Sequence, residues 1–179
     1  MRDLKRAVAE FLACERIAVV GMARDGQSPA NMIYRKLAQT GHRVFAVNPN
    51  AQEIEGIRCY STVAAVPGGV DAAVIVTPPS AAAAVVESCA TAGVRWVWLH
   101  RSFGEGSMSD AAVERCSVHG INVIPGGCPM MHLAPVDPGH ACMRTVLRLF
   151  GGLPVPQHGR AAVADPRPGR RAAGAAPAP

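Results

Sequence analysis

The chain has 179 residues, of which 49% are hydrophobic, so it can bury a core, but its longest apolar runs fall far short of the ~20 residues that a membrane-spanning helix needs. The formal net charge of +5 is concentrated in an arginine-rich C-terminal end, and the remainder shows no basic stripe, which argues against a nucleic-acid partner. The six cysteines form no C-x-x-C pair and are expected to be reduced thiols.

Residues 3–14 are predicted to form an amphipathic helix that packs on the core. Its apolar residues recur at helical spacing: Leu4, Val8, Phe11 and Leu12. The same segment carries Asp3 and Glu10 and lacks the apolar centre of a signal peptide. We therefore expect a cytoplasmic protein without a membrane partner.

A strand, a loop and a helix are predicted over residues 16–41. The apolar run Ile17–Val20 ends at Gly21 and is typical of a strand covered on both faces. Ser28-Pro29 signals a helix start, with Ser as the N-cap and Pro in the first helical position. Because free N–H groups and the helix dipole point out of a helix N-terminus, this loop is expected to hold an anion.

The following segments alternate between predicted strands and predicted helices. Further strands are predicted over 42–47, 70–76, 94–99 and 121–124, with a short extended piece near 54–60. Helices are predicted over 80–92, from Ser107 or Ser109 to His119, and over 140–150, with a short helix capped by Ser61. In the last helix, the inward side chains are expected to be Met143, Val146, Leu147 and Phe150.

This alternation predicts an α/β fold, with a single doubly wound, Rossmann-like and mainly parallel sheet and helices on both faces. We expect that domain to occupy residues 1–154. Residues 155–179 are rich in Pro, Ala and Arg, almost lack large apolar side chains, and are predicted to form a disordered tail.

A ligand of such a fold binds at the carboxyl ends of the strands. The first loop, GMARDGQS, is neither a G-x-G-x-x-G fingerprint nor a Walker A loop. Enzymes that bind NAD usually carry Asp or Glu after the second strand, where this chain has Asn48-Pro49. The difference argues against NAD and favours a nucleotide with a phosphate near its ribose, which Arg24 could contact; the alternative is that Arg24 is a solvated surface residue.

Five segments in order resemble the CoA-binding domain family, whose fold is similar to the CoA-binding domain of the succinyl-CoA synthetase alpha subunit. They are IAVVGMARD, GHRVFAVNPNAQEIEGIRCY, VDAAVIVTPPS, GVRWVWLH and GINVIPGGCPMM. The resemblance implies a nucleotide-binding site for coenzyme A or an acyl-CoA. The implied site residues are Gly21, Ala23 and Arg24 over the phosphates, Asn48 and Pro49 beside the adenosine, and Thr77, Pro78 and Pro79 under the pantetheine or pyrophosphate. Many relatives carry Ser in place of Ala23, and Gln-x-Gly where His100 begins the loop near the thiol end.

Cysteine and histidine cluster near the end of the domain, at Cys128, His132, His140 and Cys142. They could ligate a metal, although their spacing matches no standard zinc motif. Alternatively, Cys128 lies near the CoA thiol, and His100 or His132 lowers its pKa so that it accepts an acyl group. The third interpretation is structural: Met131 and Cys142 belong to the core.

The leading hypothesis is a CoA-binding protein with a non-catalytic or regulatory role, because the resemblance brings no settled reaction. The alternatives are an NAD(P)-dependent oxidoreductase on the same fold and the metal or thiol module. Met and Trp side chains predicted to be exposed near the sheet edge are compatible with a homodimer.

Overall fold

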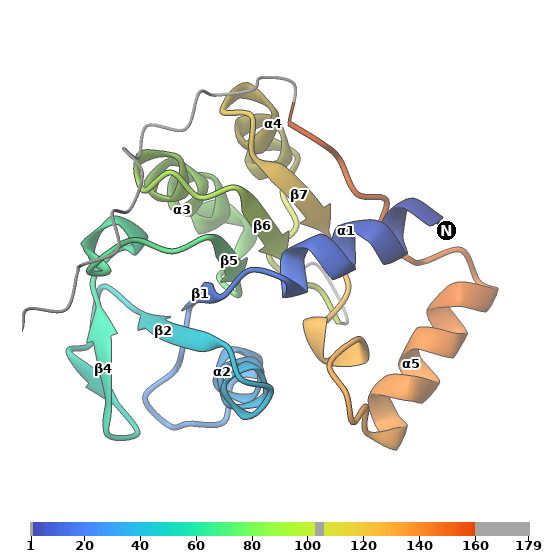
Figure 1. Cartoon of the computed structure of the whole chain (residues 1–179), viewed down its shortest axis with the longest axis horizontal. Helices are drawn as coiled ribbons and strands as arrows, with labels where there is room; N and C mark the ends of the chain where they lie inside the picture. Colours follow the sequence, from blue (N-terminus) through green and yellow to red (C-terminus); the bar gives the residue numbers. More distant parts are fainter. Residues whose placement is uncertain (1, 103–105, 160–179) are drawn as a thin grey trace, which may run out of the picture.

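The structure, a computed structural model, describes residues 2–102 and 106–159, and its centre is one sheet with helices on both faces (Figure 1). The strands are β1 (Arg16–Val20), β2 (Arg43–Val47), β3 (Glu53–Ile54), β4 (Ile57–Tyr60), β5 (Ala72–Ile75), β6 (Trp96–Leu99) and β7 (Asn122–Pro125). The helices are α1 (Arg2–Leu12), α2 (Pro29–Gln39), α3 (Pro79–Thr91), α4 (Asp110–Val118) and α5 (Pro138–Leu149), with 3-10 turns η1 (Val63–Ala65) and η2 (Pro129–Met131).

The strands of the described residues follow the order β3-β4-β2-β1-β5-β6-β7. Neighbouring strands are parallel throughout, except for the antiparallel pair β3 and β4. The chain first builds outward from β1 to β2 and β4, and then from β5 to β7 on the other side. The predicted doubly wound α/β fold is confirmed, and its switch point lies between β1 and β5.

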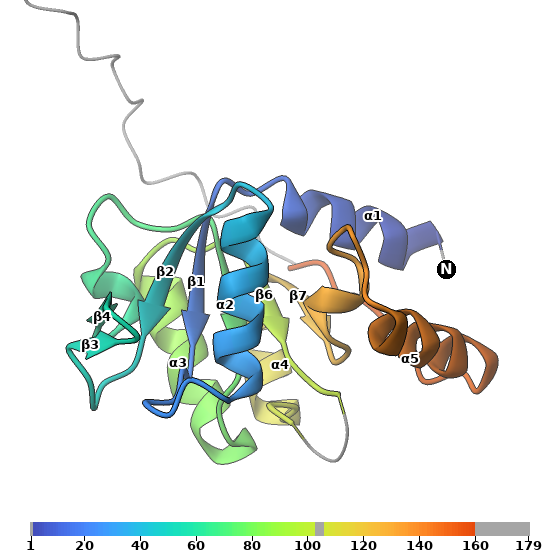
Figure 2. The same ribbon diagram turned by 90° about the horizontal axis from the view of Figure 1, so that it is seen from below.

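Two apolar layers hold the sheet between the helices, and Figure 2 shows α2 in front of the sheet with α3 and α4 behind it. On the first face, Phe11 of α1 meets Trp98 of β6 edge to face, with ring centroids 5.3 Å apart. On the second face, Val86 of α3 and Cys116 of α4 are fully buried. Strands β1, β5 and β6 are buried at every position, because helices cover both of their faces.

The helix starts follow the capping rules, with one difference from the sequence prediction, at η1. The Ser28 hydroxyl accepts the Asn31 N–H and Pro29 opens α2, as expected. Ser109 caps α4, whereas Ser107 is buried elsewhere, and Thr62 rather than Ser61 caps η1.

The predicted inward side chains of the last helix are confirmed for two of the four and wrong for the other two. No residue of α5 is buried, Val146 is half exposed, and Phe150, just after the helix, is 83% exposed. Only Met143 and Leu147 are partly buried against the core. The helix lies beside η2 and α1 beyond the edge of the sheet, so only one side of its apolar stripe has a partner (Figure 2).

Two further predictions, for the Trp side chains and for Cys142, are wrong, and the prediction for Met131 is confirmed. Trp96 and Trp98 are buried, so they cannot form the exposed edge that the homodimer prediction used. Cys142 is exposed rather than in the core, while Met131 is fully buried.

Part of the predicted tail is described. The Gln157 backbone exchanges hydrogen bonds with Val123 of β7, which places residues 155–159 along that strand. The rest of the tail, residues 160–179, lies outside the described residues. None of the helices described is both long enough and apolar enough to cross a bilayer.

Candidate functional site

The loops that follow β1 and β5 meet at the switch point. Gly21 has a φ of +99°, and a Cβ placed on it would overlap the carbonyl oxygen of Val76. Only glycine combines this backbone conformation with this close approach. The predicted importance of Gly21 therefore has a steric basis in the contact between the two loops.

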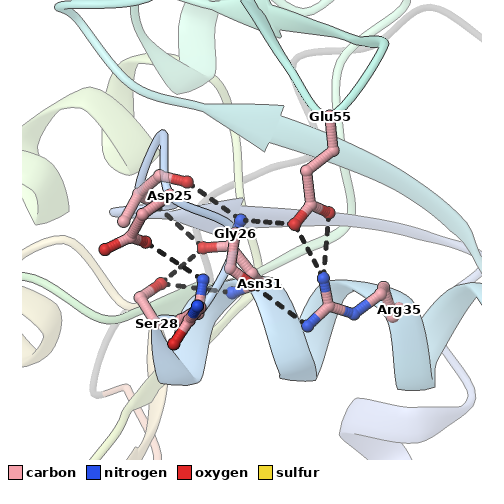
Figure 3. A network of polar contacts seen from close by, with 8 residues as sticks. Asp25, Gly26, Ser28, Asn31, Arg35 and Glu55 are labelled. Atoms are coloured by element: carbon pink, nitrogen blue, oxygen red, sulfur yellow. Dashed lines mark hydrogen bonds and ion pairs between the residues drawn. The ribbon is translucent and has the colours of Figure 1, made fainter.

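Asn31 holds the loop after β1 in shape from the first turn of α2 (Figure 3). Its side chain is fully buried; Oδ1 accepts the Ala23 N–H at 2.9 Å and Nδ2 donates to the Ala23 carbonyl at 3.0 Å. The Ser28 hydroxyl donates to the same Oδ1 at 2.5 Å. Ala23 thus contributes its backbone to a fixed loop, and the residue that fixes it is one that the sequence analysis did not single out.

The hairpin between β3 and β4 is tied to this loop through Glu55. Its carboxylate accepts two hydrogen bonds from Nη1 of Arg35 in α2, at 2.7 and 3.0 Å (Figure 3). Nη2 of Arg35 also donates to the Gly26 carbonyl at 3.1 Å. Because the ion pair is partly exposed, it adds little to the stability of the fold, and its main role is to fix the position of the hairpin.

Asn48, at the end of β2, links the first and second loops. Its Nδ2 donates to the Met22 carbonyl at 2.7 Å, and its Oδ1 accepts the Asn50 N–H at 2.7 Å. The exposed Arg24 guanidinium reaches across and donates to the Asn50 carbonyl. Both polar atoms of Asn48 are therefore used in bracing the loops.

A hollow of about 580 Å³ opens beside this second loop. Its lining residues are Pro49, Asn50, Ala51, Gln52, Arg58, Cys59, Tyr60, Ser61 and Ala65. Pro49 is the only residue of the predicted set that lines it, and Arg58 is a cation that sequence reasoning did not select.

A second hollow, of about 410 Å³, lies at the ends of β5 and β6. Its lining residues are Pro29, Val76, Thr77, Pro78, His100, Ser102, Gly106 and Ser107. This hollow brings together Thr77, Pro78 and His100 as predicted, while Pro79 begins α3 directly behind them.

The buried Ser107 hydroxyl fixes the backbone of Thr77. It donates to the Thr77 carbonyl at 2.7 Å and accepts the Thr77 N–H at 2.9 Å. The Oγ1 atom of Thr77 is buried and has no hydrogen-bond partner among the described residues. Buried hydroxyls are nearly always paired, so this atom marks a place where a polar group of a ligand would be stabilised.

His100 provides a neutral imidazole at the same hollow. Its side chain is 5% exposed, and its Nε2 lies 2.9 Å from the Ser102 hydroxyl. Burial and, to a smaller extent, the neighbouring His140 lower the pKa of His100 to about 4. At neutral pH this ring is an uncharged hydrogen-bonding group.

The surroundings of Cys128 do not favour a thiolate. Cys128 is buried, and burial raises the pKa of its thiol, although the Ser102 hydroxyl acts in the opposite direction. His132 cannot supply the expected positive charge, because burial and then Arg144 lower its pKa to about 4. The proposed metal ligands also fail to converge: within the described part of the chain, no three His, Cys, Asp or Glu side chains are placed to hold one ion.

Comparison with known proteins gives a consistent picture. The model of a family described as CoA binding domain matches residues 15–134. The chain is 31% identical to acetate–CoA ligase (ADP-forming) I of Archaeoglobus fulgidus over 118 residues, which are 63% of this chain and 17% of the ligase.

Solved structures agree with this match. The dinucleotide-forming acetyl-coenzyme A synthetase 1 of Ca. Korarchaeum cryptofilum is 32% identical with a TM-score of 0.56, over 72% of this chain and 28% of that one. A hypothetical protein from Pyrococcus horikoshii OT3 shares the fold at 23% identity, with a TM-score of 0.64, over 82% of this chain and 92% of that one. The chain thus spans a small part of the curated ligase and nearly all of a small protein with this fold.

Proposed function

The chain belongs to the CoA-binding domain family, and on that basis we propose that it binds coenzyme A, or an acyl-CoA, along the carboxyl edge of its sheet. The observation that carries the proposal is the convergence of loops from four adjacent strands, β2, β1, β5 and β6, on the switch point of a family member. Ligands of open α/β sheets bind at that point.

Each of the two hollows would bind a different part of the ligand. The hollow beside Pro49 and Arg58 would take the adenosine and its 3′-phosphate, with Arg24 close by on the first loop. The loop after β1, whose shape is fixed by Asn31, would lie against the pyrophosphate at the N-terminus of α2. This assignment keeps Gly21, Ala23 and Arg24 at the phosphates.

The hollow beside Thr77, Pro78 and His100 would take the pantetheine end. The unpaired Thr77 hydroxyl and the neutral His100 ring are suited to an uncharged chain with amide groups. The raised pKa of the Cys128 thiol supports a binding role over acyl transfer to that cysteine.

We propose a non-catalytic or regulatory role, in the cytoplasm, for the region described. The curated ligases with which it shares sequence are several times longer, and the matched segment is only 17% of one of them. A role within a larger enzyme is the competing possibility, and an assay of the chain for acetate–CoA ligase activity would detect it.

Calorimetric titration of the reduced chain with CoA, NAD and NADP in one buffer tests the proposal. We expect CoA to bind and the two dinucleotides to give no signal, because Asn48, in the position of the expected carboxylate, uses both of its polar atoms on the backbone. Binding of NADP without CoA would establish the oxidoreductase alternative instead. Light scattering on the same sample measures whether the chain is a homodimer.

A further inference from the structure

A third hollow, of about 380 Å³, lies between α1 and α5 and shares no residue with the two hollows of the candidate site. Figure 2 shows these two helices at the same end of the molecule. The lining residues are Leu4, Lys5, His132, Arg144, Thr145, Arg148 and Leu153. All of them except His132 lie outside residues 15–134, so the family match does not account for this hollow.

The hollow is strongly basic. Its lining contains three cationic side chains and no acidic one. Lys5 and Arg148 are exposed, and neither makes a hydrogen bond or ion pair within the described residues. Arg144 donates to the Met131 carbonyl at 2.7 Å, which holds its guanidinium at the wall. Three positive charges are therefore gathered around one space without a counter-charge in its lining.

His132 adds an unused hydrogen-bonding group to the same space. Its ring lies against Trp98, with centroids 5.9 Å apart, and its nitrogens make no hydrogen bond within the described residues. Burial keeps the ring neutral near pH 7, so one nitrogen is an available N–H donor. Leu4 and Leu153 supply the apolar part of the lining.

We propose that this hollow binds a small phosphate-rich anion of the pyrophosphate or triphosphate class. Guanidinium groups match pairs of phosphate oxygens, and an ammonium group adds a point charge. A single carboxylate would neutralise one of the three cations, whereas a chain of two or three phosphates carries enough charge for all of them. Such phosphates occur free or at the end of a nucleotide, and the test separates these sources.

The test is calorimetric titration of the full chain with inorganic tripolyphosphate in low salt. Lys5→Gln combined with Arg148→Gln should weaken binding by about 10-fold or more, because each lost contact is charge-assisted. The fold should survive, since both side chains are exposed and unpaired. The matched control, Arg43→Gln with Arg115→Gln, removes the same charge from two surface ion pairs elsewhere and should change the affinity by less than about 2-fold.

Two further measurements fix the place and the source of the anion. The His132 ring signals should shift in NMR spectra as tripolyphosphate is added, and prior saturation with CoA should leave its affinity unchanged. Equal affinities for ATP and tripolyphosphate would identify a site that contacts the phosphates alone. A higher affinity for ATP would identify a site that also contacts the nucleoside. The proposal is overturned if no binding is measured, if both double variants lose affinity equally, or if CoA displaces the anion. The first two of these outcomes do not depend on whether CoA binds, so a failure of this proposal and a failure of the proposed CoA site can be told apart.

Discussion

Gly21 and Val76 are in direct contact across the switch point, so close that a Cβ on Gly21 would overlap the Val76 carbonyl oxygen. The contact joins the loop after β1 to the loop after β5, which together form the centre of the candidate site. A single glycine thus sets the spacing between the part of the site assigned to phosphates and the part assigned to pantetheine.

Gly21→Ala should destabilise the chain by about 3 kcal/mol and abolish measurable CoA binding, because it adds both a strained backbone and a steric overlap. Gly41→Ala is the matched control. Gly41 has a φ of +91°, close to that of Gly21, but a Cβ there would meet nothing within 4 Å. Gly41→Ala should lower the free energy of unfolding by about 1 kcal/mol and leave CoA binding intact. Similar losses for the two variants in urea unfolding would show that the loop contact does not matter.

Asn31→Ala should loosen the loop after β1. The change leaves the Ala23 N–H without its partner and the Ala23 carbonyl with only the Gly26 N–H, at a cost of about 2 kcal/mol, and we expect CoA affinity to fall by about 10-fold. Asn122→Ala is the control, because Asn122 also bonds the backbone through both of its polar atoms, but at the first residue of β7. Unchanged CoA affinity in Asn31→Ala would mean that the loop keeps its shape without this amide.

Arg24→Ala should separate CoA from its dephosphorylated form. If Arg24 meets the 3′-phosphate, the variant loses about 10-fold in affinity for CoA and little for dephospho-CoA, since only CoA carries that group. Arg58→Ala is the informative comparison, because Arg58 lines the hollow from β4, whereas Arg24 reaches its edge through the Asn50 carbonyl. Were Arg58→Ala alone to show the selective loss, the phosphate contact would belong to Arg58.

The fold could be predicted from the sequence because its signals are local. Apolar runs ending in Gly or Pro, and Ser28-Pro29 at a helix start, specify each element without knowledge of the others. Asn31 and Ser107 were not selected because a polar residue in a helix or loop looks the same in the sequence whether it faces water or a buried backbone group. Their roles arise only when Ala23 and Thr77 are brought beside them.

The burial of α5 also could not be predicted from the sequence. Its apolar stripe correctly predicts a helix, but periodicity does not say whether a partner covers the stripe. Phe150 follows a helix placed beyond the sheet edge and remains exposed. Likewise, the spacing of Cys128 and His132 suggested shared chemistry, whereas burial makes one thiol harder to ionise and one imidazole harder to protonate.

Stability should fall as the pH is lowered from 6.5 towards 4. The pKa values of His100 and His132 are lowered to about 4 in the folded chain, against about 6.5 in the unfolded chain, so the unfolded state binds more protons in this window. Buried His100 should contribute about 2 kcal/mol of this loss between pH 7 and pH 5, and the partly exposed His132 a smaller amount. Urea unfolding at both pH values should show a clearly smaller pH dependence in His100→Gln than in the unchanged chain, with His158→Gln as an exposed control. A full pH dependence in His100→Gln would contradict the burial of a neutral ring.

Thiol reactivity should distinguish Cys142 from Cys128. Cys142 is exposed on α5, whereas Cys128 is 2% exposed and its pKa is raised by burial. Because the thiolate is the reactive form, brief treatment of the folded chain with iodoacetamide at pH 7 should alkylate Cys142 and spare Cys128. Mass spectrometry of the digested chain locates the adduct, and unfolding in urea before treatment should expose both thiols. If Cys128 instead reacts first in the folded chain, or forms a mixed disulfide with CoA disulfide, then its thiol is accessible from the hollow beside Ser102. A covalent role in acyl transfer would then replace the binding role proposed for this end of the site.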